Sequence, residues 1–163
     1  MLDGLPMRTL EGLDATALPL ESLVAEGAGS AWLGPQPLDE VFRQLASSLY
    51  LVLPSACYEG FPRTLVEAFA CGVPVIASRH GSLQELVDDG RTGLLFDPAQ
   101  PRELAERLRW ANEHPEAMLE MGRAAREEYL ARYTPSHNLE DLLGVYQRAI
   151  ADGARASGVH RVS

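Results

Sequence analysis

The spacing of apolar and polar positions divides the 163-residue chain into an irregular beginning and a regular remainder. Glycine and proline interrupt every apolar pattern in residues 1–30, so this segment is expected to be irregular. Beyond it, continuous apolar runs predict short strands at 31–33, 50–53, 74–77 and 94–96. Runs without polar alternation are typical of strands that are buried on both faces of a parallel sheet.

Helical periodicity fills the intervals between these runs. It predicts helices over 38–47, 62–71 and 83–87, and three further helices that begin near Pro101, Pro115 and Pro135. Strands that alternate with helices predict an α/β fold, a Rossmann-like three-layer sandwich with a short parallel sheet and a helical C-terminus. We therefore expect one domain over 31–150. Residues 151–163 have few apolar positions and are expected to form a disordered tail.

The composition excludes several classes of protein. The formal net charge is −9 and all 14 basic residues are arginine, so the overall field repels a nucleic-acid backbone. Two cysteines are too few for a disulfide-stapled secreted domain, and the four histidines lack the spacing of metal ligands. Without a signal-peptide pattern or an apolar run of membrane-spanning length, we expect a cytoplasmic protein with no transmembrane segment. Peripheral contact with the inner membrane surface stays open.

The segment 54–72 combines a strand end, a loop and a helix start, at the sheet edge where parallel α/β folds bind ligands. Pro62 suits the first helical position, because the N–H that it lacks would have no helical partner there. The backbone N–H groups of Arg63, Thr64 and Leu65 are then expected to be free. Together with the helix dipole, they favour a bound phosphate group.

Two carboxylates flank this helix start. Glu67 lies little more than one turn inside, and helical side chains lean toward the amino end. Its carboxylate can accept hydrogen bonds from both hydroxyls of a ribose. Glu59 precedes the helix and suits a second polyhydroxyl group, and Gly60 lets the backbone approach that ligand closely. The alternative interpretation is a solvated loop carboxylate and a solvated helical one.

The stretch from Glu59-Gly60-Phe61 through Glu67 to Ser78 resembles the E-x7-E motif of family 4 retaining glycosyltransferases of the GT-B fold. The resemblance continues through 81–96 and into the closing helices, and covers roughly residues 31–150. It implies that Glu67 binds the ribose of a nucleotide sugar and that Glu59, the implied catalytic residue, binds the hydroxyls of the donor sugar. It also implies that the diphosphate is held by the segment Gly60, Phe61, Pro62, Arg63, Thr64 and Leu65.

The implied donor is a UDP- or GDP-hexose, and the resemblance implies neither a cofactor nor a metal. The family clamps the diphosphate with an arginine and a lysine from the start of this domain, whereas this chain contains no lysine. Pro62 stands where many members have glycine, a change that a helix start tolerates. The resemblance therefore implies the donor-binding half of a hexosyltransferase, without the preceding acceptor-binding domain and expected to be inactive alone.

Two alternatives stay open. One is a non-catalytic remnant, or a subunit that docks on a separate acceptor-domain chain through the apolar stripe from Leu139 to Ile150. The other is a nucleotide-sugar epimerase, because such enzymes share the GT-B architecture and the fold alone does not distinguish the two reactions.

Overall fold

The computed structural model describes residues 34–55, 57 and 60–158. Along the chain the elements are α2 (Leu38–Ser47), β1 (Leu51–Leu53), α3 (Arg63–Ala70), β2 (Val75–Ser78), α4 (Leu83–Leu86), β3 (Gly93–Phe96), α5 (Pro101–Glu113), α6 (Pro115–Arg132) and α7 (Pro135–Gly158). The helices and strands predicted within 38–96 are confirmed to within one residue at each end. The predicted irregular segment 1–30 and the predicted strand at 31–33 lie outside the described residues.

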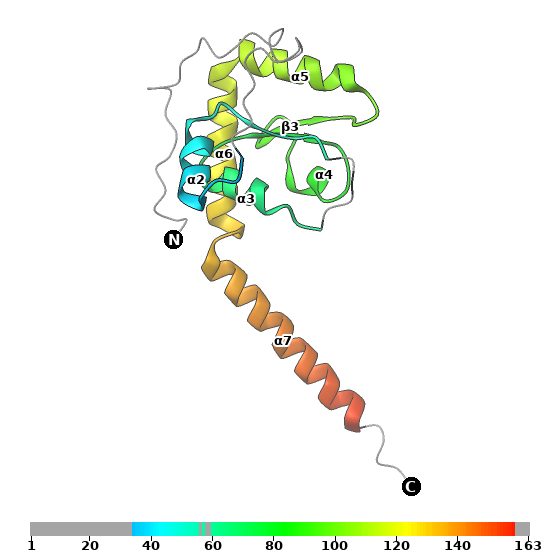
Figure 1. Cartoon of the computed structure of the whole chain (residues 1–163). Helices are drawn as coiled ribbons and strands as arrows, with labels where there is room; N and C mark the ends of the chain where they lie inside the picture. Colours follow the sequence, from blue (N-terminus) through cyan, green and yellow to red (C-terminus); the bar gives the residue numbers. More distant parts are fainter. Residues whose placement is uncertain (1–33, 56, 58–59, 159–163) are drawn as a thin grey trace.

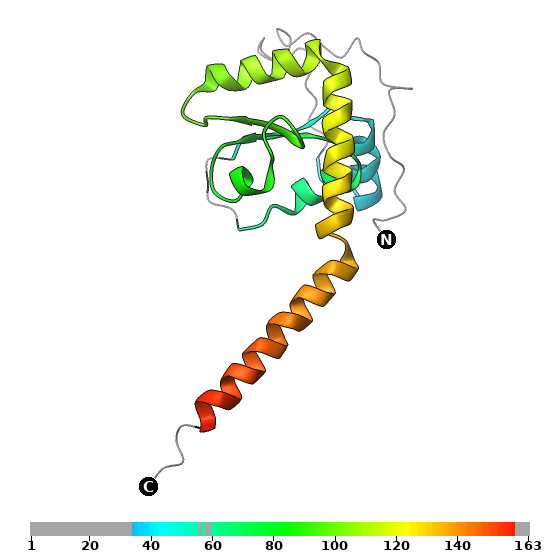
Figure 2. The same cartoon turned by 180° about the vertical axis from the view of Figure 1, so that it is seen from behind.

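The three strands form one parallel sheet in the order β1-β2-β3. Successive side chains of a strand point to opposite faces, so β2 serves two cores. Val75 and Ala77 pack with α3 in one apolar cluster, and Ile76 packs with residues of α5 and α6 in the other. Helices therefore cover both faces of the sheet, as Figures 1 and 2 show from opposite sides. The predicted Rossmann-like three-layer sandwich is confirmed.

Helix α6 joins the two apolar clusters. Its first half contributes Met118 and Met121 to the cluster around Ile76. Its second half contributes Ala125 and Tyr129 to the cluster around α3. Since α6 packs in both clusters, it fixes the position of α3 relative to the sheet.

The carboxyl end of α3 is fully hydrogen-bonded. The helix ends in a Schellman motif at Gly72, whose φ of 70° lies in the left-handed region. The N–H of Gly72 donates to the carbonyl of Phe69 at 3.0 Å, and that of Val73 donates to the carbonyl of Ala68 at 2.9 Å. These bonds satisfy carbonyls that a helix end otherwise leaves without a partner.

Two residues of α6 also hold this end of α3. The buried guanidinium of Arg126 donates to the carbonyl of Ala70. Gly122 lies against the carbonyl of Gly72, so closely that a Cβ atom on Gly122 would collide with it. The approach of α6 to the turn after α3 thus requires a residue without a side chain.

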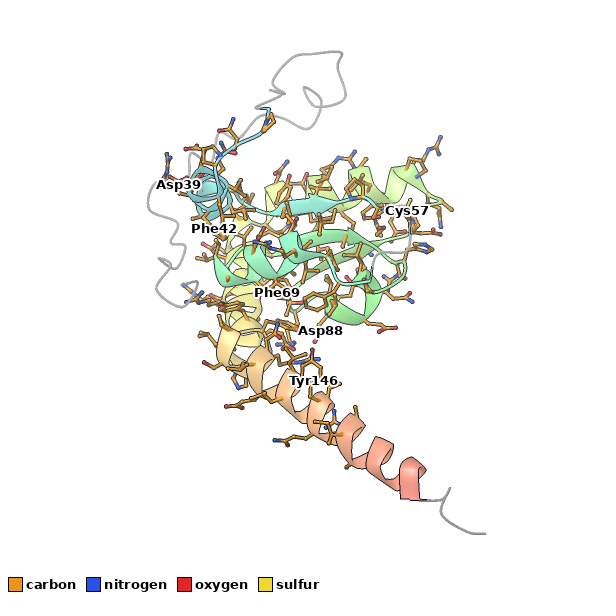
Figure 3. The ribbon with its side chains drawn as sticks, turned by 60° about the horizontal axis from the view of Figure 1, so that its bottom comes forward. Asp39, Phe42, Cys57, Phe69, Asp88 and Tyr146 are labelled. Atoms are coloured by element: carbon orange, nitrogen blue, oxygen red, sulfur yellow. The ribbon has the colours of Figure 1, made fainter. Side chains whose placement is uncertain are left out.

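Helix α7 projects from the rest of the molecule in both views (Figures 1 and 2). The prediction of a disordered tail from residue 151 is wrong as far as Gly158, because α7 continues to that residue. A helix that is already formed adds residues at little cost, so it extends without a packing partner. The distal part of α7, beyond Tyr146, extends past the body in Figure 3. None of the helices in the described part of the chain has the length and apolarity that a membrane span requires.

Candidate functional site

The end of β2 anchors the loop that follows β1. The buried side chain of Ser78 donates a hydrogen bond from its Oγ to the carbonyl of Ser55 at 2.6 Å. The Oγ of Ser55 donates in turn to the carbonyl of Cys57 at 3.2 Å. The sequence pattern gives no signal for Ser78, because its role depends on the neighbouring strand. Glu59 lies outside the described residues, so its catalytic role stays a prediction.

The amino end of α3 differs from its prediction in two details. Pro62 is the N-cap residue, with φ −73° and ψ 109°, rather than the first helical residue. The N–H of Leu65 donates to the carbonyl of Pro62 at 3.1 Å, so the prediction of a free amide at Leu65 is wrong. An N-cap carbonyl is available for such a bond, which tightens the first turn.

Two amides nevertheless remain available at this helix end. Among the described residues, the N–H groups of Arg63 and Thr64 have no hydrogen-bond partner, and no side chain caps the helix. The helix dipole adds a partial positive charge of about one half at this position. The end of α3 is therefore able to bind an anion through its backbone.

Glu67 is a charged residue that the fold buries, with only 9% of its surface exposed. Its Oε1 accepts a hydrogen bond from Nε of Arg63 at 3.0 Å. The side chain of Arg63 is 80% exposed, so solvent weakens the contribution of this ion pair to stability. The pair keeps a carboxylate and a guanidinium on one face of α3, within one turn of the free amides.

The charge of Glu67 also affects the pKa of a buried side chain, Cys71. Burial raises the pKa of the Cys71 thiol to about 11; Arg126 opposes this shift and Glu67 reinforces it. The thiol is therefore protonated at neutral pH.

The segment before α3 is open to solvent. A Cβ atom on Gly60 would meet nothing within 4 Å, so no close approach among the described residues requires glycine there. Phe61 is 56% exposed, and its ring lies beside that of Tyr133 with centroids 5.8 Å apart. The structure thus brings residues 60–65 and Glu67 together at one end of one helix.

A polar cavity of about 430 Å³ lies elsewhere, between α4, β3 and α6. Ion pairs line it: Arg79 pairs with Asp89, and Arg91 bridges Asp88 and Glu128. Of the predicted site residues that the structure describes, 60–65 and Glu67, none lines this cavity. Among the described residues, no three or more His, Cys, Asp or Glu side chains are grouped so as to hold a metal ion.

The fold is that of GT-B glycosyltransferases. The structure is similar to sucrose-phosphate synthase from Thermosynechococcus elongatus, with a TM-score of 0.72 and 29% identity, over 82% of this chain and 34% of that chain. It is also similar to HepE from Anabaena in complex with UDP-glucose, with a TM-score of 0.67 and 25% identity, over 78% of this chain and 35% of that chain.

Residues 23–128 match the family of group 1 glycosyl transferases, and the chain belongs to this family. The D-inositol 3-phosphate glycosyltransferase of Nocardioides sp. is 32% identical over 148 residues, which are 88% of this chain and 32% of that protein. The family resemblance predicted from the E-x7-E segment is confirmed. The chain spans about a third of the length of these relatives. The matched region includes every predicted site residue and ends before α7.

Proposed function

We propose that this chain is the donor-binding part of a retaining hexosyltransferase that acts in the cytoplasm. In this proposal, the diphosphate of a UDP- or GDP-hexose binds at the amino end of α3. The main support is the arrangement at that end, where two amides that have no partner among the described residues lie within one turn of a buried carboxylate. This segment belongs to the part of the chain that matches the glycosyltransferase family.

Each group then has a role in transfer. The anomeric carbon forms a bond to an acceptor hydroxyl, which loses its proton, and its bond to the diphosphate breaks. Negative charge therefore develops on the leaving nucleoside diphosphate. The amides of Arg63 and Thr64 and the helix dipole stabilise that charge without reorganisation. The exposed guanidinium of Arg63 adds positive charge beside them, so the proposed mechanism requires no metal. Glu67 accepts hydrogen bonds from the ribose, and Glu59 from the hydroxyls of the hexose.

Because the chain spans about a third of its relatives, we expect it to bind the donor but to have little or no turnover alone. The missing part is therefore proposed to be an acceptor-binding domain, in the same protein or on a separate chain.

The test is calorimetric titration of the chain with UDP, GDP and their hexoses, where we expect dissociation constants in the millimolar range or below. Replacing Glu67 by Gln keeps the shape and removes the charge, which weakens binding about tenfold or more. Glu120→Gln is the matched control, because Glu120 is a helical carboxylate that also pairs with an arginine, Arg123, on an exposed face. Absence of binding at millimolar ligand, or equal binding by Glu67→Gln and wild type, would refute the proposal.

A second candidate, a non-catalytic subunit, is favoured by one observation on α7. The helix exposes a row of large apolar side chains: Leu139, Leu142, Leu143, Val145, Tyr146 and Ile150. Exposed apolar surface of this kind marks interaction sites. Light scattering after coexpression with an acceptor-domain chain distinguishes the candidates, because a subunit forms a complex of defined mass and a remnant does not. Product analysis with a labelled donor then separates glycosyl transfer from epimerisation.

A further inference from the structure

An aromatic contact joins the proposed donor-binding segment to the far end of α6. The rings of Phe61 and Tyr133 are tilted by 60° with centroids 5.8 Å apart. Phe61 directly precedes Pro62, the N-cap residue of α3. On the other side of the loop, the nearest described anchor is the hydrogen bond from Ser78 to Ser55. The contact with Tyr133 therefore lies next to the two free amides.

The backbone of Tyr133 is held where α6 ends and α7 begins. Its N–H donates to the carbonyl of Tyr129 at 2.8 Å, which closes the last turn of α6. The next residue, Thr134, is buried, and its Oγ lies 2.8 Å from Nδ1 of His137 in the first turn of α7. The backbone from which the Tyr133 ring projects is thus held in place between α6 and α7.

The ring itself is packed on more than one side. It lies against the apolar cluster around α3, and the guanidinium of Arg132 lies 5.3 Å from its centroid. Arg132 is itself bonded to Glu128 at 2.8 Å. A side chain confined in this way is a rigid surface for the more exposed Phe61.

The hydroxyl of Tyr133 is buried and has no hydrogen-bond partner among the described residues. Buried hydroxyls are almost always hydrogen-bonded, but no described residue bonds to this one. The aromatic ring is the part of the side chain that makes contacts. A phenylalanine would supply the same surface.

We infer that Tyr133 is a positioning residue, whose ring holds Phe61 and thereby the segment from Gly60 to Pro62 that presents the amides of Arg63 and Thr64. This role rests on the proposed function at the same helix end. It adds a connection from the α6–α7 junction to the donor site. An aromatic pair of this geometry changes an equilibrium constant by a factor of roughly two to ten.

The first test needs no ligand. In the free chain, the amide resonances of Arg63 and Thr64 are compared among wild type, Tyr133→Phe and Tyr133→Leu. We expect Tyr133→Leu to shift both resonances and Tyr133→Phe to leave them in place. Tyr146→Leu is the control, since it removes an exposed tyrosine from α7. Unchanged resonances in folded Tyr133→Leu, or equal shifts in both Tyr133 variants, overturn the inference.

The second test is a double-mutant cycle for UDP affinity with Phe61→Leu, Tyr133→Leu and the double variant. Phe61 is exposed, so its replacement does not threaten folding. We expect each single change to weaken binding roughly two- to tenfold and the double change to add little to either. If wild type binds UDP and the two losses are additive, the inference is wrong. If wild type does not bind UDP, the same cycle is measured with GDP. If it binds neither nucleotide nor their hexoses, the proposed function is wrong, and the amide resonances still decide whether Tyr133 positions the segment.

Discussion

Replacing Gly122 by alanine tests whether α6 needs its close approach to the turn after α3. A Cβ atom there would collide with the carbonyl oxygen of Gly72 and would lie 3.3 Å from Cδ of Pro74. Both obstacles belong to rigid parts of the chain. The steric cost should therefore be near the upper end of the usual range for overpacking, about 3 kcal/mol. Alanine is the better helix former by about 1 kcal/mol, which leaves a net loss of about 2 kcal/mol.

Such a loss lowers the midpoint of thermal unfolding by about 4–8 °C for a chain of this size, which circular dichroism measures directly. The matched control is Gly144→Ala in α7, where a Cβ atom would meet only Nη1 of Arg148, at 3.4 Å. There the gain in helix propensity acts without a steric cost, so the midpoint should not fall. An unchanged or raised midpoint in Gly122→Ala would show that the close approach is not required.

Three further outcomes follow from single side chains. Hydrogen bonds from Arg91 and then Arg132 hold the pKa of the Glu128 carboxyl below its ordinary value of 4.5. The ionised Glu128 carboxylate therefore stabilises the folded state fully above pH 4.5. This stabilisation is lost as the pH falls through the lower pKa that Glu128 has in the folded state. Thermal midpoints should show Glu128→Gln below wild type near neutral pH and equal to it in acid. With a pKa of about 11, only about one Cys71 thiol in a thousand is ionised at pH 8. Iodoacetamide should therefore modify the exposed Cys57 and leave the buried Cys71 unmodified, as mass spectrometry measures. Modification of Cys71 in the native protein would contradict its burial. Urea unfolding should find Tyr133→Phe as stable as wild type or more stable, by up to about 1 kcal/mol, because it removes a buried hydroxyl that has no partner in the described part of the chain. A clear loss of stability would reveal a partner for that hydroxyl.

Much of the fold could be predicted because apolar runs and helix-starting prolines are local features of the sequence. The strands at 51–53, 75–78 and 93–96 coincide to within one residue with continuous apolar runs at 50–53, 74–77 and 94–96, and α5, α6 and α7 each begin at a proline. These signals depend on the residues of one element. The end of α7 is harder to predict, since the small number of apolar residues beyond 151 suggests a tail. A long helix extends without packing, so apolar content does not mark its end.

The candidate site could be predicted in outline only. The segment Gly60–Glu67 was located through its motif, and the structure does bring these residues to one helix end. The sequence predicts three free amides. Among the described residues two remain, because the N–H of Leu65 donates to the carbonyl of Pro62. That difference depends on the φ and ψ angles of one residue, which the sequence does not specify.

By itself, the sequence determined the family, the α/β class and the position of the E-x7-E segment, because motif and periodicity are properties of neighbouring residues. Only the tertiary structure decided what holds that segment. The contacts of Tyr133 with Phe61, Ser78 with Ser55 and Gly122 with Gly72 join residues from different elements. Such pairs leave no periodic signal in the chain, since they form only when separate helices and strands pack against one another.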